Sequence, residues 1–435
     1  MKNTDRRSTM NKKLFDYIAS SPTAYHAAAH TAEVLKEAGY KELFENENWK
    51  LKSGRGYFVR RNGSSLIAFR VPNTESTGFM ITASHSDSPC FKIKENPEIA
   101  DKYYVKLSTE GYGGMIYSSW MDRPLSVSGR VTVKSEKGIE IRLVDFKDPI
   151  AIIPNVAIHM NRQVNSGYSY NAAVDMLPLF GGERDSFKTA VASLAGVSVE
   201  DMITTDLFLY NPQKGYEWGS YVSAPRLDDL QCAFSALTAF VESADSLVVN
   251  SAIPVYALFD NEEVGSQTKQ GAASTFLFDV MSRVAAALGK EYSCLVANSF
   301  MVSCDNAHAC HPNHPEFSDK NHTVYMNEGI VIKYNANQKY TTDAVSAALF
   351  KLICAEAKSP VQYYANRADM AGGSTLGNIS NTQVSLNTVD IGLAQLAMHS
   401  SFETAGKKDT KYLVRALSKF YSKALKKTEN GYEFN

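Results

Sequence analysis

Apolar positions recur with a helical period near the start of the chain. Leu14 and Ile18 fall on one face, Pro22 interrupts the pattern, and AYHAAAHTAEVLKEAGY resumes it until Gly39. The pattern therefore predicts two helices within residues 12–40. Two mainly apolar runs then predict buried strands, SSLIAFRVP (64–72) and GFMITASHS (78–86).

The pattern becomes mainly that of β-structure between about 92 and 222. RVTVKSEKGIEIRLVDF (130–146) alternates apolar and polar residues, which predicts a hairpin that turns at 136–138. AIIPNVAIHM (151–160) indicates further strand, and SFKTAVASLAG (186–196) indicates a helix. We expect this segment to be an inserted, mainly β module.

Helix and strand patterns alternate again after the insert. LDDLQCAFSALTAFVESA (227–244) and DAVSAALFKLICAEAK (343–358) have helical patterns. IPVYALF (253–259) is fully apolar, as in a strand inside a parallel sheet. VQYYA (361–365) and VSLNTVDIG (384–392) indicate further strands. This alternation predicts an α/β layered domain.

The length of 435 residues favours two domains. The predicted architecture is a discontinuous α/β domain made of residues 1–91 and 223–435, interrupted by the β-rich segment 92–222. Hydrophobic residues make up 44% of the chain, enough for a large core. The 45 basic and 46 acidic residues nearly balance, which argues against a nucleic-acid partner.

The chain also has features expected of a soluble, cytoplasmic protein. No apolar stretch approaches the roughly 20 residues of a membrane-spanning helix, and no apolar segment follows the polar start MKNTDRRSTMNKK. Met10 could be a second start, which would make the first nine residues a loose tail. The cysteines have no framework spacing and are expected to be reduced, namely Cys90, Cys232, Cys294, Cys304, Cys310 and Cys354.

Glu262 and Glu263 follow a predicted buried strand, in VYALFDNEEVGSQ. Ligands of open α/β sheets bind at the carboxyl ends of strands. Since adjacent side chains there point in different directions, one carboxylate could hold a metal while the other handles protons. An acidic, solvated turn is the simpler interpretation of this pair alone.

Two further motifs have the same ambiguity. In SHSDSP, His85 and Asp87 lie two residues apart, so an extended chain places them on one face and Asp87 could orient the imidazole. A surface turn with one histidine is the alternative. In SAPRLDDL, Asp228 and Asp229 stand where a loop meets a helix, and helix capping would explain an aspartate there without catalysis.

Histidines concentrate in CDNAHACHPNHPEFSDKNH (304–322), which holds four of the nine in the chain together with Asp305. A local structural zinc site is the competing interpretation, but the Cys and His spacings of such sites are missing. His399, in QLAMHS, could equally be an ordinary packed or surface histidine. His26 and His30 lie four apart on a predicted helix but lack the glutamate of HExxH, so we expect them to pack or to face solvent.

Taken together, these motifs supply two histidines, three separated acidic groups and a spare glutamate, which fits two divalent ions sharing a bridging carboxylate. The order SHSDSP, APRLDDL, ALFDNEEVGS, SCDNAHACHPN and QLAMHS closely resembles the M18 family of metallo-aminopeptidases, the aspartyl aminopeptidase group. The similarity continues through IVIKYNANQKYTTDAVS and DMAGGSTLG and covers the chain from about Leu14.

The resemblance implies a role for each matching position. Glu262 is the general base for the water that two ions share. Asp87 is the second catalytic residue, and its role is to orient His85 through a hydrogen bond. Two zinc ions per subunit are implied, although such ligands also accept manganese or cobalt. The implied ligands are Asp228 for both ions, His85 and Asp305 for one, and Glu263 and His399 for the other.

The resemblance further implies a homo-oligomer, a tetrahedral dodecamer built from dimers, in which the insert makes the subunit contacts. His159 matches a histidine that reaches the neighbour's active site, although packing within the insert is an alternative. Lys333, Tyr340 and His308 match positions that line the substrate pocket. Lys333 could pair with an acidic N-terminal side chain, but one lysine leaves the choice between acidic and neutral residues open.

Three functions remain open from sequence. The first is an aminopeptidase that acts on peptides. The second is a hydrolase of the same fold that acts on N-acyl amino acids or peptide C-termini. The third is a non-catalytic assembly or binding protein, although such relatives usually lose a ligand or the base, and all six positions are present here.

Overall fold

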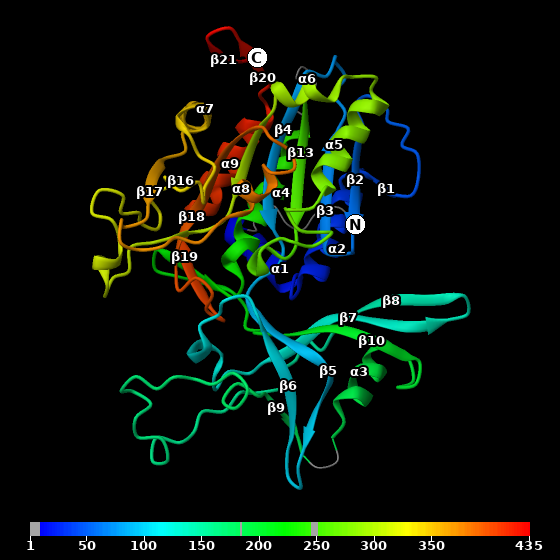
Figure 1. Cartoon of the computed structure of the whole chain (residues 1–435), viewed down its shortest axis with the longest axis vertical. Helices are drawn as coiled ribbons and strands as arrows, with labels where there is room; N and C mark the ends of the chain where they lie inside the picture. The colour runs from blue at the N-terminus through cyan, green and yellow to red at the C-terminus, as the bar shows by residue number, and fades with distance from the viewer. Residues whose placement is uncertain (1–8, 183–184, 245–250) are drawn as a thin grey trace.

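The computed structural model describes residues 9–182, 185–244 and 251–435, and within them it contains two large β-sheets and a separate two-stranded hairpin (Figure 1). Residues 1–8 lie outside the described part of the chain, and with them most of the segment expected to be a loose tail before Met10. The larger sheet has 13 strands, in the order β1-β2-β3-β13-β4-β14-β18-β19-β12-β11, with β15 and β16 beside β18 and β17 beside β16. Its strands are β1 (Lys41–Leu43), β2 (Gly56–Arg61), β3 (Ser65–Arg70), β4 (Gly78–His85), β11 (Tyr216–Trp218), β12 (Tyr221–Ala224), β13 (Ala252–Phe259), β14 (Phe300–Cys304), β15 (Ala307–His308), β16 (Ile330–Tyr334), β17 (Val361–Ala365), β18 (Asn387–Leu396) and β19 (Glu403–Gly406).

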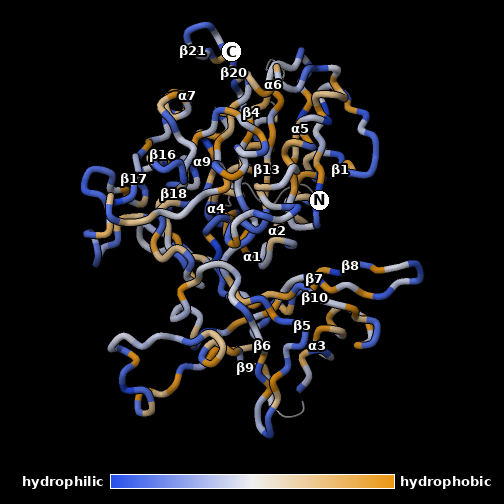
Figure 2. Tube along the Cα trace, viewed as in Figure 1, coloured by the Kyte–Doolittle hydropathy of each residue, from blue (hydrophilic) through white to orange (hydrophobic). Residues whose placement is uncertain are grey.

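Helices cover both faces of the large sheet, so its middle strands are buried on both sides. One apolar core joins the sheet to α1, α2, α4, α7 and α9, and a second joins it to α5 and α6. Polar segments lie mainly at the periphery, as in the C-terminal hairpin (Figure 2). The helices are α1 (Met10–Ala19), α2 (Ala24–Glu37), α4 (Leu227–Glu242), α5 (Phe276–Ala287), α6 (Tyr292–Ala297), α7 (Ala344–Glu356), α8 (Leu376–Ser380) and α9 (Asp409–Tyr421), and the hairpin is β20 (Leu425–Thr428) with β21 (Gly431–Phe434).

Four neighbouring strands of the large sheet run parallel, and this arrangement sets the position of the site. β13 pairs with β4, β4 with β14, and β14 with β18, each in parallel register. Phe259 lies opposite His85 at the ends of β13 and β4. Because the carboxyl ends of parallel strands meet at one edge, the loops that follow them converge there.

The second sheet contains six antiparallel strands in the order β8-β7-β10-β5-β6-β9 and lies below the large sheet in Figure 1. Its own apolar core includes residues of α3 (Phe187–Ala195). The fold is therefore α/β with an additional β-sheet, as the sequence predicts. The strands are β5 (Cys90–Ala100), β6 (Val105–Tyr112), β7 (Ser126–Ser135), β8 (Gly138–Asp145), β9 (Leu179–Gly181) and β10 (Met202–Tyr210).

The small sheet draws its strands only from residues 90–210. β11 and β12 instead join the large sheet through β19, although β11 falls inside the segment 92–222. The division of the chain at 91 and 222, and a dimerisation role for the insert, stay predictions.

Most of the predicted elements are present, and one is wrong. The helices on both sides of Pro22, the hairpin that turns after Ser135 and the helix of α3 are confirmed. The strand expected at 151–160 is limited to isolated bridges at 151–153. The rest of that segment forms turns, and Met160 has 83% of its surface exposed, because its apolar residues have no core to pack against.

The expectations of reduced cysteines and of no membrane-spanning helix can be compared with the structure. All six cysteines lie among the described residues and none forms a disulfide. Among the described residues, no helix has the length and apolar character needed to cross a membrane.

Candidate metal centre

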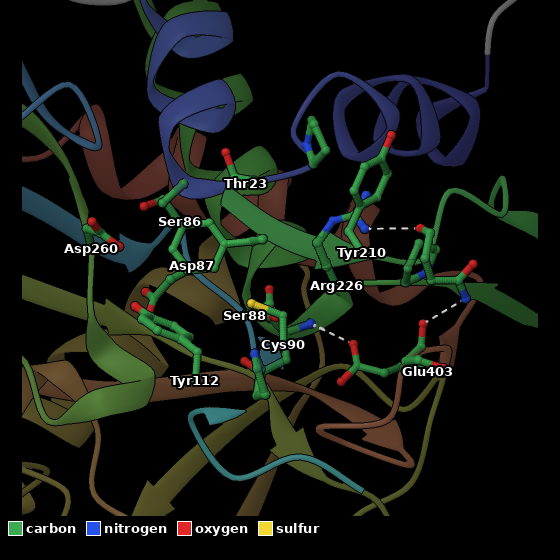
Figure 3. Close-up of a pocket in the computed structure, with 18 of the residues that line it drawn as sticks. Thr23, Ser86, Asp87, Ser88, Cys90, Tyr112, Tyr210, Arg226, Asp260 and Glu403 are labelled. Atoms are coloured by element: carbon green, nitrogen blue, oxygen red, sulfur yellow. Dashed lines mark hydrogen bonds between the residues drawn. The ribbon is translucent and has the colours of Figure 1, made fainter. Parts of the chain in front are cut away.

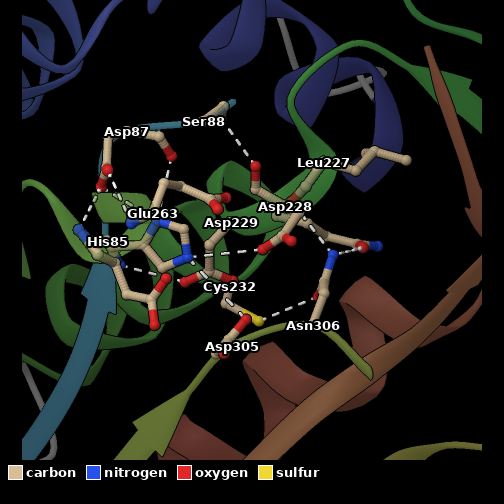
Figure 4. A network of polar contacts seen from close by, with 12 residues as sticks. His85, Asp87, Ser88, Leu227, Asp228, Asp229, Cys232, Glu263, Asp305 and Asn306 are labelled. Carbon is tan, nitrogen blue, oxygen red and sulfur yellow. Dashed lines mark hydrogen bonds and ion pairs between the residues drawn. The ribbon is translucent and has the colours of Figure 1, made fainter. Parts of the chain in front are cut away.

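Five loops and strand ends bring the predicted ligands together above the carboxyl edge of the large sheet. His85 is the last residue of β4, and Asp305 follows β14. Glu263 lies in η3 (Glu262–Val264), just after β13, and His399 follows β18. Asp228 approaches from the start of α4 (Figure 4).

The first half of the cluster surrounds the imidazole of His85. Its Nε2 lies 3.5 Å from Oδ1 of Asp228 and 3.9 Å from Oδ1 of Asp305. Its Nδ1 lies 3.1 Å from the carbonyl oxygen of Asp87 and 3.3 Å from that residue's carboxylate. Asp87 therefore orients the imidazole through Nδ1, and Nε2 faces the carboxylates of Asp228 and Asp305 (Figure 4).

The second half surrounds His399. Its Nε2 lies 3.5 Å from Oδ2 of Asp228 and 3.4 Å from Oε2 of Glu263. Its Nδ1 lies 2.7 Å from the carbonyl oxygen of Gly114, which orients the ring. Asp228 thus presents one oxygen to each histidine, as a carboxylate that bridges two ions would do.

The unpaired oxygens of this cluster fit divalent cations. Oδ1 of Asp229 and Oε1 of Glu263 are buried and make no hydrogen bond to a described residue, and the buried Oδ1 of Asp228 has the 3.5 Å contact with Nε2 of His85. Burying an unpaired carboxylate oxygen is costly, and metal coordination removes that cost. Carboxylate oxygens and imidazole nitrogens are ligands that zinc accepts.

The proton affinities of the cluster agree with this interpretation. Burial and the nearby Asp228 raise the pKa of Glu263 well above its usual value. Burial, with help from Asp305, raises the pKa of Glu262 to about 8. The pKa of Asp228 is lowered because His399 and His85 outweigh its burial. Carboxyl groups this crowded hold protons that a divalent cation would displace.

Capping does not explain Asp228 and Asp229. Both residues have non-helical backbone angles, and the residue at the cap position, Arg226, makes no side-chain capping bond. Instead, Oδ2 of Asp229 accepts a hydrogen bond from the backbone N–H of His85 at 3.2 Å. The capping interpretation is therefore wrong, and Asp229 lies within the same cluster of possible ligands.

Asp87 organises more of the site than the sequence indicates. Besides its contact with His85, its carboxylate accepts hydrogen bonds from the backbone N–H groups of Glu262 and Glu263, at 3.2 and 3.1 Å. The hydroxyl of Tyr112 donates a third, at 2.8 Å. Asp87 therefore connects the loop after β4 to the loop after β13.

Three of the four predicted substrate-binding residues come from elements beside the cluster. Nζ of Lys333 is buried, donates to the carbonyl oxygen of Asn306 at 2.7 Å and lies 3.4 Å from Oδ2 of Asp305. The ring of Tyr340 packs 5.5 Å from the same ammonium. His308 is exposed on β15.

The fourth predicted substrate-binding residue, His159, is exposed in the turns that follow residue 153, and it does not belong to the metal-ligand clusters of its own chain.

A local zinc site in 304–322 is not formed. Among the described residues, the groups that could hold a metal all lie around His85, Asp228 and Glu263. His314 and His322 instead contact neighbouring carboxylates on the surface, Glu316 at 2.9 Å and Asp319 at 2.8 Å.

His26 and His30 pack as expected. Nδ1 of His26 lies 2.9 Å from Oγ1 of Thr23 and 3.3 Å from Oγ of Ser128 in β7, so this histidine joins α2 to the small sheet. The His30 ring packs against Tyr17, with 5.5 Å between the ring centroids. Neither residue belongs to a metal-ligand cluster within the described chain.

The buried position of His26 predicts a pH-dependent stability. Burial lowers the pKa of His26 from 6.5 to about 4, although Asp145 opposes the shift. Since the unfolded chain binds this proton more readily, the stability is present above pH 6.5 and is lost as the pH falls toward 4. We expect the burial of His26 to lower the free energy of unfolding by about 2 kcal/mol as the pH falls from about 7 to about 5. Urea unfolding should show a flatter pH dependence for His26→Gln, and identical slopes would contradict this origin.

Two residues of the site gave no recognisable signal in the sequence. Glu403 is buried four residues after His399 and binds backbone groups of the cluster. Nδ2 of Asn306 contacts the carbonyl oxygen of Leu227 and the side chains of Gln231 and Gln395, which supports the Asp228 turn from below (Figure 4). The only hint in the sequence is that each lies close to a predicted ligand: Asn306 follows Asp305, and Glu403 lies four residues after His399.

A pocket lies behind Asp87 and Asp228, where the two sheets meet (Figure 3). Arg226 closes one wall by donating to the carbonyl oxygens of Asn211 and Ile18 at 3.2 and 3.1 Å. Apolar walls lower the local dielectric and so strengthen electrostatic interactions at the cluster. The aromatic residues that line the pocket are Tyr25, Tyr112, Trp120, Phe208 and Tyr210.

Comparison with known proteins agrees with the motifs. A family model described as aminopeptidase I zinc metalloprotease (M18) matches residues 17–421. The chain belongs to the M18 peptidase family. It is 44% identical over 428 residues to the probable M18 family aminopeptidase 2 of Clostridium acetobutylicum, covering 94% of this chain and 98% of that protein. A Pseudomonas aeruginosa protein of the same description is 38% identical over 429 residues, covering 96% and 99%.

Solved structures of M18 relatives have the same fold. The crystal structure of yeast aminopeptidase 1 matches with a TM-score of 0.84 and 29% identity, covering 94% of this chain and 96% of that one. The S. cerevisiae mApe1 dodecamer matches with a TM-score of 0.83 and 30% identity, covering 94% and 95%. This M18 peptidase is a hydrolase with metal-dependent aminopeptidase function, and the resemblance inferred from its motifs is confirmed.

Proposed function

We propose that this M18 peptidase releases the N-terminal residue of peptides at a centre of two zinc ions, with Glu262 as the general base. The observation that carries the proposal is the position of Asp228, whose two oxygens lie 3.5 Å from Nε2 of His85 and of His399. One ion would use His85, Asp228 and Asp305, and the other would use Asp228, Glu263 and His399. Such ions polarise the scissile carbonyl and activate a shared water.

Glu262 is suited to transfer the proton of the attacking water to the leaving amine. It is half-buried beside His85 and Glu263, and its backbone N–H is fixed by Asp87. Its carboxylate belongs to the same group of acidic and imidazole side chains as His85 and Glu263, so it is placed to take a proton from water held there and pass it to the leaving amine nitrogen. Asp87 holds Glu262 and His85 in one arrangement.

A free amino terminus is the group that such a centre could hold. One of the two ions would orient the substrate by binding its neutral α-amine, which an N-acylated terminus cannot offer. Free aminoacyl-anilides should therefore be cleaved, while the N-acetylated anilides and C-terminally free N-blocked dipeptides should not. Cleavage of the blocked substrates at comparable rates would refute the proposal.

Lys333 provides a test of preference for acidic residues. An ammonium has three N–H donors, and Asn306 and Asp305 are the acceptors near this one. A remaining donor would make a charge-assisted bond to an N-terminal Asp or Glu, worth about 1.5–3 kcal/mol, or about 10–100-fold.

We expect Asp- and Glu-anilides to exceed Leu-anilide in kcat/KM by that factor, and Lys333→Met to remove the difference. Lys351→Met, on the exposed face of α7, is the matched control. Equal kcat/KM values for the acidic and leucine substrates in the wild type would contradict this role of Lys333.

We also propose that the chain assembles as a homo-oligomer, a dodecamer like the yeast relative, through the small sheet. Large apolar side chains are exposed there, including Ile139 and Ile141 at 59% each. His159 lies between Ile158 and Met160, which are also exposed, and so would serve a neighbouring subunit.

Co-assembly of two inactive variants tests this arrangement. His159→Phe and Glu262→Gln subunits should each be inactive alone and should regain activity when refolded together, because mixed contacts restore complete sites. Size-exclusion chromatography with light scattering measures the assembly. Recovery no greater than the sum of the separate variants would show that His159 does not act across subunits.

A further inference from the structure

Glu403 holds two segments of the metal centre together by their main chains. It is the first residue of β19 and only 2% exposed. Its Oε2 accepts a hydrogen bond from the backbone N–H of Asp228 at 3.0 Å, and its Oε1 accepts one from the backbone N–H of His399 at 2.9 Å. One carboxylate thus joins two ligands of the same predicted metal position.

Regular secondary structure does not fix these two ligands. Asp228 has φ −83° and ψ 109°, outside the helical region although it lies at the start of α4. His399 has a left-handed φ of 67° in the turn after β18. Neither residue continues a helix or a strand, so contacts with other segments hold these main chains. Glu403 binds both backbone N–H groups, while Oγ of Ser88 and the backbone N–H of Ile116 donate to their carbonyl oxygens at 2.8 and 3.0 Å.

The remaining contacts of Glu403 lead to the other metal position. Nε2 of Gln395 donates to Oε1 of Glu403 at 3.3 Å. Oε1 of Gln395 in turn accepts a hydrogen bond from Nδ2 of Asn306 at 2.8 Å, and Asn306 is next to Asp305. A continuous buried chain of hydrogen bonds therefore connects ligands from three separate loops.

We infer that Glu403 is a positioning residue of the metal centre, which keeps Asp228 and His399 at the separation that an ion between them requires. This inference rests on the proposed two-zinc function. Groups that orient metal ligands without touching the metal typically contribute 10–100-fold to metal affinity. The expected effect of losing the clamp is of that size, and it concerns mainly the position formed by Asp228, Glu263 and His399.

Asp409 provides a matched control for a purely structural role. Its buried carboxylate also accepts two backbone N–H groups, from Asn327 at 2.6 Å and Gly329 at 3.2 Å. It belongs to no metal-ligand cluster among the described residues. Asp409→Asn therefore removes a buried carboxylate clamp of the same kind, whose backbone partners are not proposed zinc ligands.

The test is zinc binding by the full-length protein, titrated against a chromophoric chelator. Glu403→Gln should weaken one of the two zinc-binding events by about 10–100-fold, because the amide NH2 group cannot accept a backbone N–H. Asp409→Asn should bind both ions as the wild type does. Wild-type zinc affinity in Glu403→Gln, or an equal loss in Asp409→Asn, would overturn the inference.

Glu403→Asp extends the test if the glutamine variant does not fold, since aspartate keeps the charge but is too short to reach both amides. It should also weaken one zinc-binding event, and unchanged zinc binding in a folded Glu403→Asp protein would overturn the inference. Near-ultraviolet circular dichroism establishes the fold of each variant. A wild type that binds two zinc ions but cleaves no peptide would refute the proposed function, whereas the comparison of zinc affinities would still decide the role of Glu403.

Discussion

Glu262→Gln is expected to bind two zinc ions as the wild type does and to lose about 10²–10⁴-fold in kcat. The substitution keeps the size of the side chain and its backbone hydrogen bond to Asp87 but removes the group that takes the proton. Since Glu262 is not among the proposed ligands, its loss should leave the metal centre assembled. Steady-state kinetics and zinc content of the same preparation measure both results.

The neighbouring glutamate is the control for this experiment. Oε2 of Glu263 lies 3.4 Å from Nε2 of His399, so Glu263→Gln should lose zinc as well as turnover. Adjacent, chemically identical substitutions would then have different effects. Retained activity in Glu262→Gln, or loss of zinc in both variants alike, would contradict the separation of base and ligand.

Asp228→Asn is expected to weaken both zinc-binding events by at least about 100-fold, since a shared ligand contributes more than the groups that orient it. Both of its oxygens face histidines of the cluster, at 3.5 Å each. An amide lacks the charge and offers only one acceptor oxygen, so neither position remains complete. Peptidase activity should fall below detection.

The melting temperature provides a second measure of the same change. Zinc at about 100 times its dissociation constant stabilises the wild type by about 2.7 kcal/mol per site, and chelation removes that stabilisation. Asp228→Asn should therefore change its melting temperature only slightly on chelation, since with an affinity about 100-fold weaker the same zinc concentration stabilises it by about 0.4 kcal/mol per site at most. Asp305→Asn, which alters one position only, should keep part of the shift. If Asp228→Asn and Asp305→Asn lose equal amounts of zinc, Asp228 is not the shared ligand.

The strands that carry the site could be predicted because a strand buried on both faces has a nearly continuous run of apolar residues. GFMITASHS and IPVYALF correspond to β4 and β13, and the polar residues that follow them are those that meet at the sheet edge. The parallel register that aligns their ends is a tertiary property. The candidate ligands could therefore be named from sequence, but the distances between them could not.

The wrong predictions have physical causes that a local pattern does not contain. Val156 and Ile158 alternate like strand residues, but they are about half exposed and have no strand beside them. Asp228 and Asp229 precede a helical pattern, but contacts with His85 and Glu403 hold them outside it. Glu403 and Asn306 act through backbone groups that are distant in sequence, so no motif marks them.

Anomalous diffraction at the zinc edge tests the central claim most directly. Crystals of the zinc-loaded protein should show two peaks, one beside His85 and Asp305 and the other beside Glu263 and His399, with an oxygen of Asp228 on each. A single peak, or two peaks of which one lies away from Asp228, would contradict the account.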